Sequence, residues 1–217
     1  MEKLRITDDG SATLYSIEFD QYYHSVRGAR SETQRVYIEL GLWAKMKEKS
    51  EINILEIGFG TGLNALMTAW EAQKNNIKVY YTSLEPYPIS NEDAQLLNYE
   101  SELDTNLLAQ IHKANWEEMV EINPNFFLRK VKSTIQEFST DNLFDVVYFD
   151  AFAPSSQPEL WTEEIFKKIG SITQKGGFLT TYCSKTIIRN ALQSAGFKVE
   201  KHVGMWGKRE VVRAILA

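Results

Sequence analysis

The stretch Leu55-Glu56-Ile57-Gly58-Phe59-Gly60-Thr61-Gly62 decides the fold, because an apolar strand runs directly into a turn that contains three glycines. Glycine lets the backbone approach a ligand where a Cβ atom would collide, so Gly58, Gly60 and Gly62 predict a cradle for a nucleoside cofactor. A helical pattern over 62–74 follows the turn. The alternative is an ordinary tight turn between a strand and a helix.

Two acidic residues indicate which cofactor the turn holds. A dinucleotide turn presents amide groups and a helix N-terminus to a pyrophosphate, which a carboxylate at Glu56 would repel. S-adenosylmethionine instead carries an ammonium, a sulfonium and hydroxyls. Glu85 ends the next apolar run, where a ribose-binding carboxylate belongs. We expect Glu85 to bind the ribose, and Glu56 to accept hydrogen bonds from the turn amides or the cofactor's ammonium.

The order of apolar and helical stretches predicts an α/β fold with a doubly wound, mostly parallel sheet. Strands are expected at 52–57, 78–84, 126–131, 144–149 and 177–182, and helices at 62–74, 90–99, 104–121, 159–170 and 185–195. A closing hairpin, 197–202 with 210–216, adds one antiparallel strand. Seven strands in this arrangement are typical of the Rossmann-like class I methyltransferases.

The domain organisation follows from the same pattern. Residues 51–217 form the expected methyltransferase domain, and residues 1–50 form a small appendage. In the appendage we expect a hairpin across 4–15, with Asp9-Gly10 at its turn, and a helix that Ser31 caps and that runs to about Lys47. Ser90 with Asp93 resembles a capping box at the start of the 90–99 helix.

Bulk properties fit a globular protein of 217 residues with 43% apolar and 24% charged content. The single cysteine, Cys183, excludes an internal disulfide. No apolar stretch is long enough for a signal peptide or a membrane span, so we expect a cytoplasmic protein without membrane association. The net charge of −5 gives no support to nucleic-acid binding, yet seven basic and two acidic residues follow from Lys185 onward. A solvated basic face is the alternative explanation.

Several segments together resemble one family, the methyltransferase half of the bifunctional MnmC enzyme and its stand-alone counterparts. They are Tyr23-His24-Ser25 with Gly28-Ala29 and Glu32, Leu55 to Asn64, Glu85-Pro86-Tyr87-Pro88-Ile89, Tyr148 to Pro154 with Pro158-Glu159-Leu160-Trp161, Arg189 with Leu192, Ala195-Gly196-Phe197, and Gly207-Lys208-Arg209-Glu210. The resemblance implies S-adenosylmethionine-dependent N-methylation of the 5-aminomethyl group of a wobble (2-thio)uridine in tRNA.

The chain also departs from that family. Where the family usually has an acid after the third strand, this chain has Lys132-Ser133, so a hydroxyl at Ser133 takes the place of an adenine-binding carboxylate. The flavin-dependent oxidoreductase half of the fused enzyme is not part of this sequence, so we expect no FAD to bind. We also expect that a separate oxidoreductase or aminomethyl-forming system acts on the same tRNA. His112 and His202 have no partners at metal-ligand spacing, and we expect no metal.

Catalysis is expected at the end of the fourth strand. Asp150 follows that strand and is expected to contact the cofactor and to orient the acceptor amine or take its proton, while Phe152 stacks on the uracil. The alternatives are an N-cap for Asp150 and core packing for Phe152. Asn64, in the first turn of the following helix, is expected either at the surface or on the methionine moiety of the cofactor.

Binding of the anticodon loop is expected from two further groups. The resemblance suggests that the N-terminal appendage folds over the cofactor, which brings Tyr23, His24 and Glu32 toward the substrate. Lys185, Arg189, Lys208 and Arg209 are expected to hold tRNA phosphates at the rim. Two other functions stay open, namely a methyltransferase for a small-molecule or protein amine, and a non-catalytic cofactor-binding partner subunit.

Overall fold

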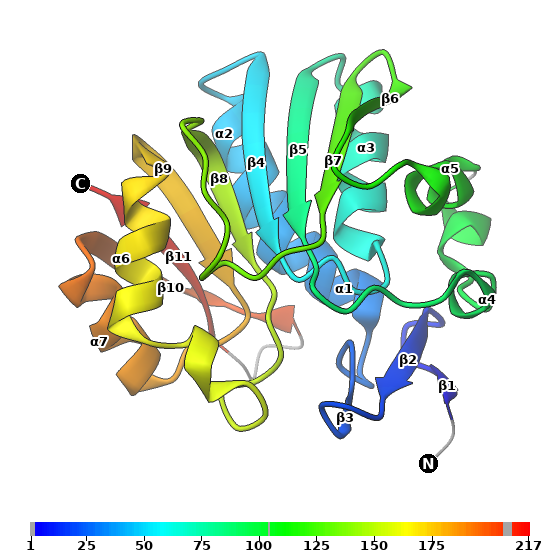
Figure 1. Cartoon of the computed structure of the whole chain (residues 1–217), viewed down its shortest axis with the longest axis horizontal. Coiled ribbons are helices and arrows are strands. Elements are labelled where there is room, and N and C mark those ends of the chain that lie inside the picture. The colour runs from blue at the N-terminus through cyan, green and yellow to red at the C-terminus, as the bar shows by residue number, and fades with distance from the viewer. Residues whose placement is uncertain (1–2, 104, 206–209) are drawn as a thin grey trace.

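The computed structural model describes residues 3–103, 105–205 and 210–217. Within these ranges the strands form a three-stranded sheet in the order β1-β2-β3 and an eight-stranded sheet in the order β10-β11-β9-β8-β4-β5-β7-β6 (Figure 1). The strands are β1 (Leu4–Ile6), β2 (Ala12–Ser16), β3 (Gln21–Tyr22), β4 (Glu51–Ile57), β5 (Lys78–Leu84), β6 (Met119–Asn123), β7 (Phe126–Val131), β8 (Phe144–Phe149), β9 (Thr173–Thr181), β10 (Phe197–Val203) and β11 (Glu210–Leu216).

The large sheet confirms the predicted architecture. The strands β9, β8, β4, β5 and β7 are neighbours and run parallel, and β11 pairs antiparallel with both β9 and β10. The closing hairpin therefore lies at one edge of a mostly parallel sheet, as the sequence pattern indicated. The carboxyl ends of the five parallel strands meet at a single edge, next to the small N-terminal sheet (Figure 1).

The predicted helix over 104–121 is wrong in its second half. The structure has a short helix, α5 (Leu107–Lys113), followed by β6, which pairs antiparallel with β7 and becomes an eighth strand. The reason is a change of period from helical to alternating, because Met119 and Glu121 are exposed while Ile122 is buried. The predicted helix at 90–99 is likewise reduced to α4 (Asn91–Ala94), whose cap, Ser90 Oγ accepting from the Asp93 amide, was expected.

Helices cover both faces of the large sheet (Figure 1). One core holds Ile54 of β4 together with a continuous helical segment, 29–46, and with α3 and α5; the other core holds Leu55 with α6 and α7. Ile54 and Leu55 belong to different cores because consecutive side chains of a strand point to opposite faces of the sheet, and both faces are buried here. The helices are α1 (Ala29–Thr33), a π-helix (Gln34–Leu42), α2 (Trp43–Met46), α3 (Leu63–Lys74), α6 (Glu163–Ser171) and α7 (Thr186–Ser194), with 3₁₀ turns at Tyr99–Glu102 and Pro158–Leu160.

The helical segment begins differently from the prediction. It starts at Ala29 rather than after Ser31, and the Ser31 amide donates instead to the carboxylate of Asp9 at 2.8 Å. Asp9 lies in the turn of the N-terminal hairpin, where Gly10 has the positive φ of 83° that the sequence indicated. A side chain from the hairpin therefore satisfies an amide of the first helical turn and fixes the small sheet to the helix.

Candidate active site

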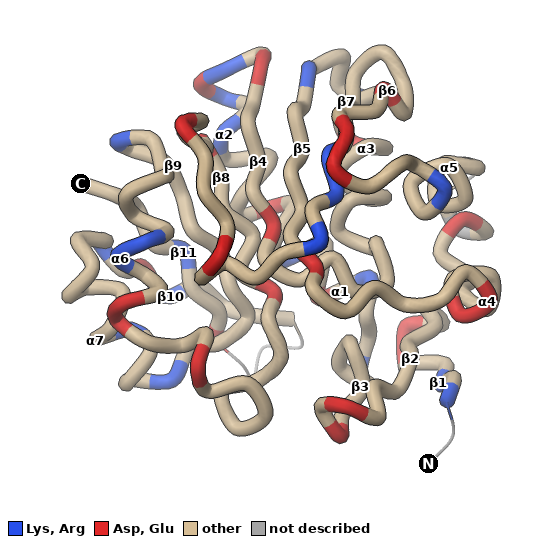
Figure 2. The backbone as a smooth tube through the Cα atoms, viewed as in Figure 1, with Lys and Arg blue, Asp and Glu red and all other residues tan. Residues whose placement is uncertain are grey.

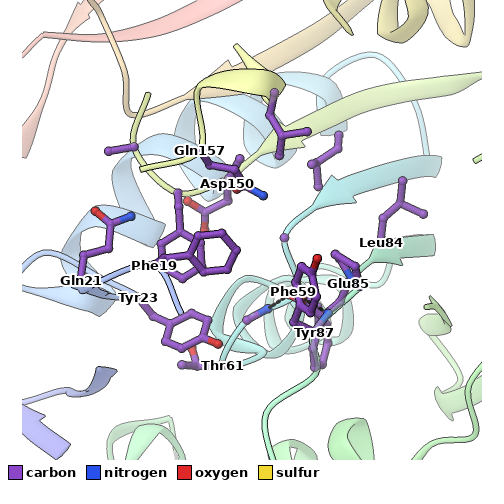
Figure 3. A pocket seen from close by; sticks show the side chains of 18 of the residues that line it. Phe19, Gln21, Tyr23, Phe59, Thr61, Leu84, Glu85, Tyr87, Asp150 and Gln157 are labelled. Atoms are coloured by element: carbon purple, nitrogen blue, oxygen red, sulfur yellow. Dashed lines mark hydrogen bonds between the residues drawn. The ribbon is translucent and has the colours of Figure 1, made fainter. Parts of the chain in front are cut away.

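A cavity of about 680 Å³ opens at the edge where the parallel strands end (Figure 3). The loops after β4, β5, β7, β8 and β9 contribute to its lining, and the small N-terminal sheet closes it from outside. Ten residues that the sequence predicted lie in this lining: Tyr23, His24, Glu32, Gly58, Gly60, Asn64, Glu85, Ser133, Asp150 and Phe152. Ligands of open α/β sheets bind at this edge, so the cavity is the candidate active site.

The glycine turn approaches its neighbours closely at two positions. A Cβ atom on Gly58 would lie 2.6 Å from the backbone oxygen of Asp150, and one on Gly60 would lie 2.9 Å from the Tyr23 ring. Both glycines also have a positive φ, which other residues rarely adopt. Gly62 is the N-cap of α3 and lies outside the cavity lining.

The two predicted acids, Glu85 and Glu56, differ in their surroundings. Glu85 receives the turn amide, because its Oε2 accepts from the Gly60 N–H at 3.0 Å and its Oε1 accepts from the Tyr87 N–H at 2.8 Å. Glu56 has no exposed surface and accepts from two side chains, Ser83 Oγ at 2.5 Å and Asn64 Nδ2 at 3.0 Å. The turn amide is therefore bound by Glu85 in the cavity wall and not by Glu56, which lies beneath the cavity; ammonium binding by Glu56 and ribose binding by Glu85 stay predictions.

Asn64 connects the buried acid to the acid in the cavity. Its Nδ2 donates to Glu56 and, at 2.8 Å, to Asp150 Oδ2, while its Oδ1 accepts from Thr33 Oγ1 at 2.9 Å. The second Asp150 oxygen, Oδ1, accepts from the Tyr37 hydroxyl at 2.6 Å. Both carboxylate oxygens of Asp150 are thus fixed by protein donors, and Asn64 is a buried network residue rather than a surface residue.

Burial raises the pKa values of both acids in this network. The pKa of Glu56 rises to about 8, because burial disfavours its charged form more than the bonds from Ser83 and Asn64 favour it. Burial also raises the pKa of Asp150, to about 6. The hydrogen bonds from Tyr37 and Asn64 lower this pKa, but by less than burial raises it. At neutral pH, Glu56 is therefore mostly protonated, while Asp150 is mostly ionised and faces the cavity.

The loop that follows β8 is held from two sides. The indole Nε1 of Trp161 donates to the Phe152 carbonyl at 2.8 Å, and the Tyr182 hydroxyl donates to the Ala151 carbonyl at 2.9 Å. Trp161 is itself buried against Phe149, with ring centroids 4.8 Å apart. Trp161 and Tyr182 together fix the backbone that carries Asp150 and Phe152.

The N-terminal sheet is attached to the glycine turn. His24 Nε2 lies 2.7 Å from Thr61 Oγ1, and the Tyr99 hydroxyl donates to the same oxygen at 3.1 Å. Burial lowers the pKa of His24 to about 4, so the ring is neutral at physiological pH. Tyr23 extends along the cavity beside Phe152, with ring centroids 5.1 Å apart.

The sequence missed several lining residues. They are Phe19, Gln21, Tyr87, Thr134, Ile135, Gln136, Gln157 and Tyr182. Most of them lie in loops without an indicative motif, and only their position at or near the end of a predicted strand could have pointed to Thr134 or Tyr182. Ser133 lines the cavity as expected, and its hydroxyl donates to the Thr134 carbonyl at 3.1 Å.

The predicted basic residues do not converge on the cavity. Lys185 is exposed at the N-cap of α7, and Arg189 donates to the Ser184 carbonyl and to Thr186 Oγ1; neither residue is in the cavity lining. Lys208 and Arg209 lie outside the described residues. Two other cations of the basic terminal region are paired with its two acids, Lys201 with Glu210 and Arg213 with Glu200.

The charge of the cavity wall is negative. Its described lining includes Glu18, Glu32, Glu85, Asp150 and Glu159, and contains neither lysine nor arginine. Acidic residues also mark the turn beside β3 (Figure 2), and one of them, Glu18, belongs to the lining. A wall of carboxyl groups attracts a sulfonium or an ammonium and repels phosphate, so its chemistry fits S-adenosylmethionine better than a phosphate-bearing nucleotide.

The described residues also bear on metal binding and on membrane insertion. Over the described ranges, no group of three or more histidine, cysteine, aspartate or glutamate side chains could hold a metal ion. None of the helices in the part of the chain that is described combines the length and apolar character needed to span a bilayer. The expected absence of metal and of FAD stays a prediction.

Comparison with known proteins identifies relatives of the whole chain. The curated protein "tRNA 5-methylaminomethyl-2-thiouridine biosynthesis bifunctional protein MnmC" of Leptospira interrogans is 29% identical over 224 residues, which cover 95% of this chain and 34% of that protein. The protein of the same name from Methylobacillus flagellatus is 31% identical over 216 residues, covering 91% of this chain and 33% of its own length. The chain thus spans about a third of the length of these relatives.

Solved structures support the same relationship. The crystal structure of MNMC2 from Aquifex aeolicus has a TM-score of 0.81 and 25% identity, and the match covers 100% of this chain and 70% of that one. The structure of DesVI from Streptomyces venezuelae, with a TM-score of 0.53 and 12% identity, shows the fold alone. The model of a family described as "S-adenosyl-L-methionine-dependent methyltransferase" matches residues 95–217, more than half of the sequence. The chain therefore belongs to the family of S-adenosyl-L-methionine-dependent methyltransferases.

Proposed function

We propose that this protein N-methylates the 5-aminomethyl group of a wobble (2-thio)uridine in tRNA, giving the 5-methylaminomethyl nucleoside. The observation that carries the proposal is the cavity itself, in which an ionised carboxylate, Asp150, lies beside aromatic rings in a wall without lysine or arginine among the described residues. Such a site suits a cationic amine attached to a flat ring. The names of the MnmC relatives support tRNA as the carrier of that ring.

The cofactor half of the cavity would be formed by the glycine turn and the loops that follow β5 and β7. S-adenosylmethionine, when bound, supplies an electrophilic methyl group on its sulfonium. Glu85 is the candidate for the ribose hydroxyls, because its carboxylate is already oriented by two backbone amides and retains free lone pairs. Ser133 and its neighbours would contact the adenine, with a hydroxyl instead of the usual acid.

The acceptor half would be organised by Asp150. Each of its oxygens accepts one bond from Tyr37 or Asn64, which leaves one lone-pair direction on each oxygen for the amine. An amine must lose a proton before its lone pair can react, and a carboxylate whose pKa lies at about 6 is a better proton acceptor than an ordinary aspartate. Asp150 therefore binds the ammonium form, accepts its proton and holds the amine in place.

The test uses tRNA that carries the 5-aminomethyl group but not its methyl. Wild-type protein is incubated with this tRNA and S-adenosylmethionine, and the digested nucleosides are analysed by mass spectrometry. We expect one methyl group to be added to the wobble nucleoside, and Asp150→Asn to slow the transfer by about 10²- to 10⁴-fold, the usual contribution of a general base. Asp145→Asn is the control, because Asp145 is a buried aspartate of β8 that binds Lys49 and the Asn53 amide away from the cavity.

A different result would select one of the other functions. The acidic cavity and the net charge of −5 also suit a small-molecule or protein amine, so transfer to such an amine and none to the tRNA would favour that function. Cofactor binding by calorimetry, without transfer to any amine, would favour a non-catalytic partner subunit. We expect the aminomethyl precursor to come from a separate enzyme system.

A further inference from the structure

We propose that Phe19 is a substrate-contacting residue, whose ring and that of Phe152 form a two-sided slot for the flat pyrimidine of the acceptor nucleoside. This inference rests on the proposed function and adds a residue that the sequence did not indicate. Phe19 lies in the turn between β2 and β3, residues 17–20, which we call the tip of the N-terminal sheet. The tip is far from the catalytic loop in the sequence but next to it in the cavity (Figure 3).

The two rings already face each other. Their centroids are 4.3 Å apart with planes inclined by 24°, so they are stacked, and both side chains are only partly buried. Tyr87 lies edge-on to Phe19 at 6.1 Å, and Tyr23 lies at 5.1 Å from Phe152. Aromatic rings that lie nearly parallel in the wall of a cavity provide a platform on which a base can stack once they separate.

The location of Asp150 determines where the acceptor ring must lie. The amine is joined to its pyrimidine through a single methylene, and Phe152 follows Asp150 by two residues in a loop that Trp161 and Tyr182 hold in place. A pyrimidine whose amine reaches Asp150 therefore lies next to the ring of Phe152. The face it would stack on is the one that Phe19 covers, so the base must enter between the two rings.

The present spacing leaves no room for a third ring. Two consecutive stacking contacts of roughly 3.5 Å each require the outer rings to separate to roughly 7 Å, which is an outward movement of Phe19 by roughly 3 Å. Among the described residues, the tip has few hydrogen bonds to the rest of the molecule, and we therefore expect it to be able to move. Ile17 is 89% exposed. The Phe19 amide donates one long hydrogen bond of 3.4 Å, to Ser16 Oγ, and the Tyr15 hydroxyl donates to the carboxylate of Asp20.

The base of the same sheet is attached firmly. His24 bonds to Thr61 in the glycine turn, and Asn98 accepts from the Ala12 amide at 2.8 Å. The sheet can therefore keep its place over the cofactor half of the cavity while its tip opens and closes on the base. In this arrangement, Phe19 stacks on one face of the pyrimidine and Phe152 on the other.

The experiment compares four variants in the methyl-transfer assay. Phe19→Ala and Phe19→Leu are expected to lower kcat/KM for tRNA by roughly 10- to 100-fold, mainly through KM, since stacking of one base is worth about that much. Phe19→Tyr keeps an aromatic face and is expected to stay within about threefold of wild type. Ile17→Ala, in the same tip but outside the cavity lining, is expected to match wild type. The Kd of S-adenosylmethionine by calorimetry is expected to be unchanged in all four.

The other possible results would each refute the proposed slot in a different way. If Phe19→Leu is as active as Phe19→Tyr, Phe19 is only an apolar cover and the slot is refuted. Equal losses of tRNA and cofactor affinity in Phe19→Ala would make Phe19 part of the cofactor wall and would also refute it. Thermal unfolding of each variant separates these results from loss of the fold. Wild-type protein that methylates no tRNA would refute the proposed function, and the nucleobase slot with it, whatever the variants do.

Discussion

At the residue scale, the amide of Asn64 links the two acids whose charge states matter most for the site. Its two N–H groups reach two carboxyl groups, Glu56 below the cavity and Asp150 in its wall. Two carboxylates so close together repel each other, so the proton stays on the one that burial penalises more. Glu56, with a pKa of about 8, takes that proton and leaves Asp150 ionised for the amine.

Glu56 should therefore make the stability of the fold depend on pH. Its pKa is raised from 4.5 to about 8 in the folded state, so the folded protein binds more protons than the unfolded chain between these values. Stability consequently falls as pH rises from about 4.5 to 8, and the loss is complete above the folded pKa. Glu56→Gln removes this effect. The difference in free energy of unfolding, Glu56→Gln minus wild type, is therefore expected to increase by a few kcal/mol as the pH is raised from 5 to 8. One unit of pKa shift corresponds to about 1.4 kcal/mol.

Urea unfolding at pH 5, 6.5 and 8 measures that difference. Glu121→Gln, which changes an exposed glutamate of β6, is the control and should show no such trend. A difference between Glu56→Gln and wild type that stays constant across this range would contradict a protonated Glu56.

Tyr37 should tune the working pH of the enzyme. Its hydroxyl donates to Asp150 Oδ1 at 2.6 Å, and this bond favours the ionised carboxylate and lowers its pKa. In Tyr37→Phe, the pKa of Asp150 should rise above about 6, so the acid limb of the kcat/KM profile should move to higher pH. We expect a larger loss of activity at pH 6 than at pH 8, where Asp150 is ionised in both proteins.

Tyr148→Phe provides the comparison for this profile. Tyr148 is a buried tyrosine whose ring centroid lies 5.1 Å from that of Tyr37, so the variant removes a neighbouring hydroxyl of the same core. The other titratable groups facing this region are Glu32, Glu56, Tyr81 and Tyr182. A loss in Tyr37→Phe that is equal at both pH values would indicate a purely structural role.

At the scale of elements, the buried parallel strands were the most predictable part of the chain. The strands at 78–84, 126–131 and 144–149 have the predicted bounds, because continuous apolar runs between turn residues are typical of strands buried on both faces. The predicted site followed from the same elements, since motifs placed after such strands must meet at one edge. Asp150, Glu85 and the glycine turn were identified in this way.

The elements that the sequence did not reveal depend on contacts between distant segments. Tyr37 reaches Asp150 across 113 positions, from a nine-residue π-helix whose apolar spacing resembles that of an ordinary helix. Phe19 lies in a short turn that has no sequence motif. What distinguishes this residue is its stacking on the ring of Phe152, which the sequence does not reveal. The strand β6 has only five residues and begins five residues after α5 ends, so its alternation is too short to outweigh the helical pattern before it.

The attachment of the N-terminal sheet to the glycine turn can be tested at this scale. His24→Ala removes the 2.7 Å contact with Thr61 Oγ1, and we expect the amides of β2 and β3 to exchange hydrogen severalfold faster while those of β4 and β5 keep their protection. The KM for the cofactor should rise, because the sheet closes the cavity. His202→Ala, in β10, is the control; unchanged exchange in β2 and β3 would show that the histidine does not hold the sheet.

At the scale of the whole molecule, the charge distribution separates two kinds of ligand. The protein carries a net charge of −5, and its cavity wall gathers carboxyl groups, while Lys201 and Arg213 of the terminal hairpin are bound to acids. Such a wall repels phosphate, so in the proposed tRNA reaction we expect the nucleoside alone to enter the cavity while the phosphates stay outside it. S-adenosylmethionine carries a net positive charge, because its ammonium and sulfonium outweigh its one carboxylate, so an acidic wall favours it over a phosphate-bearing nucleotide.

Ligand selectivity is the prediction that follows for the whole molecule. A ligand that binds only the folded state at 100 times its Kd stabilises it by about 2.7 kcal/mol, which for a protein of 217 residues raises the unfolding temperature by roughly 5 to 10 °C. We expect such a shift with S-adenosylmethionine and less than about 1 °C with ATP at the same concentration. In Glu85→Gln the shift with S-adenosylmethionine should shrink, because a carboxylate facing the cofactor is lost. A shift with ATP as large as that with S-adenosylmethionine would mean that the wall's carboxyl groups do not select the ligand.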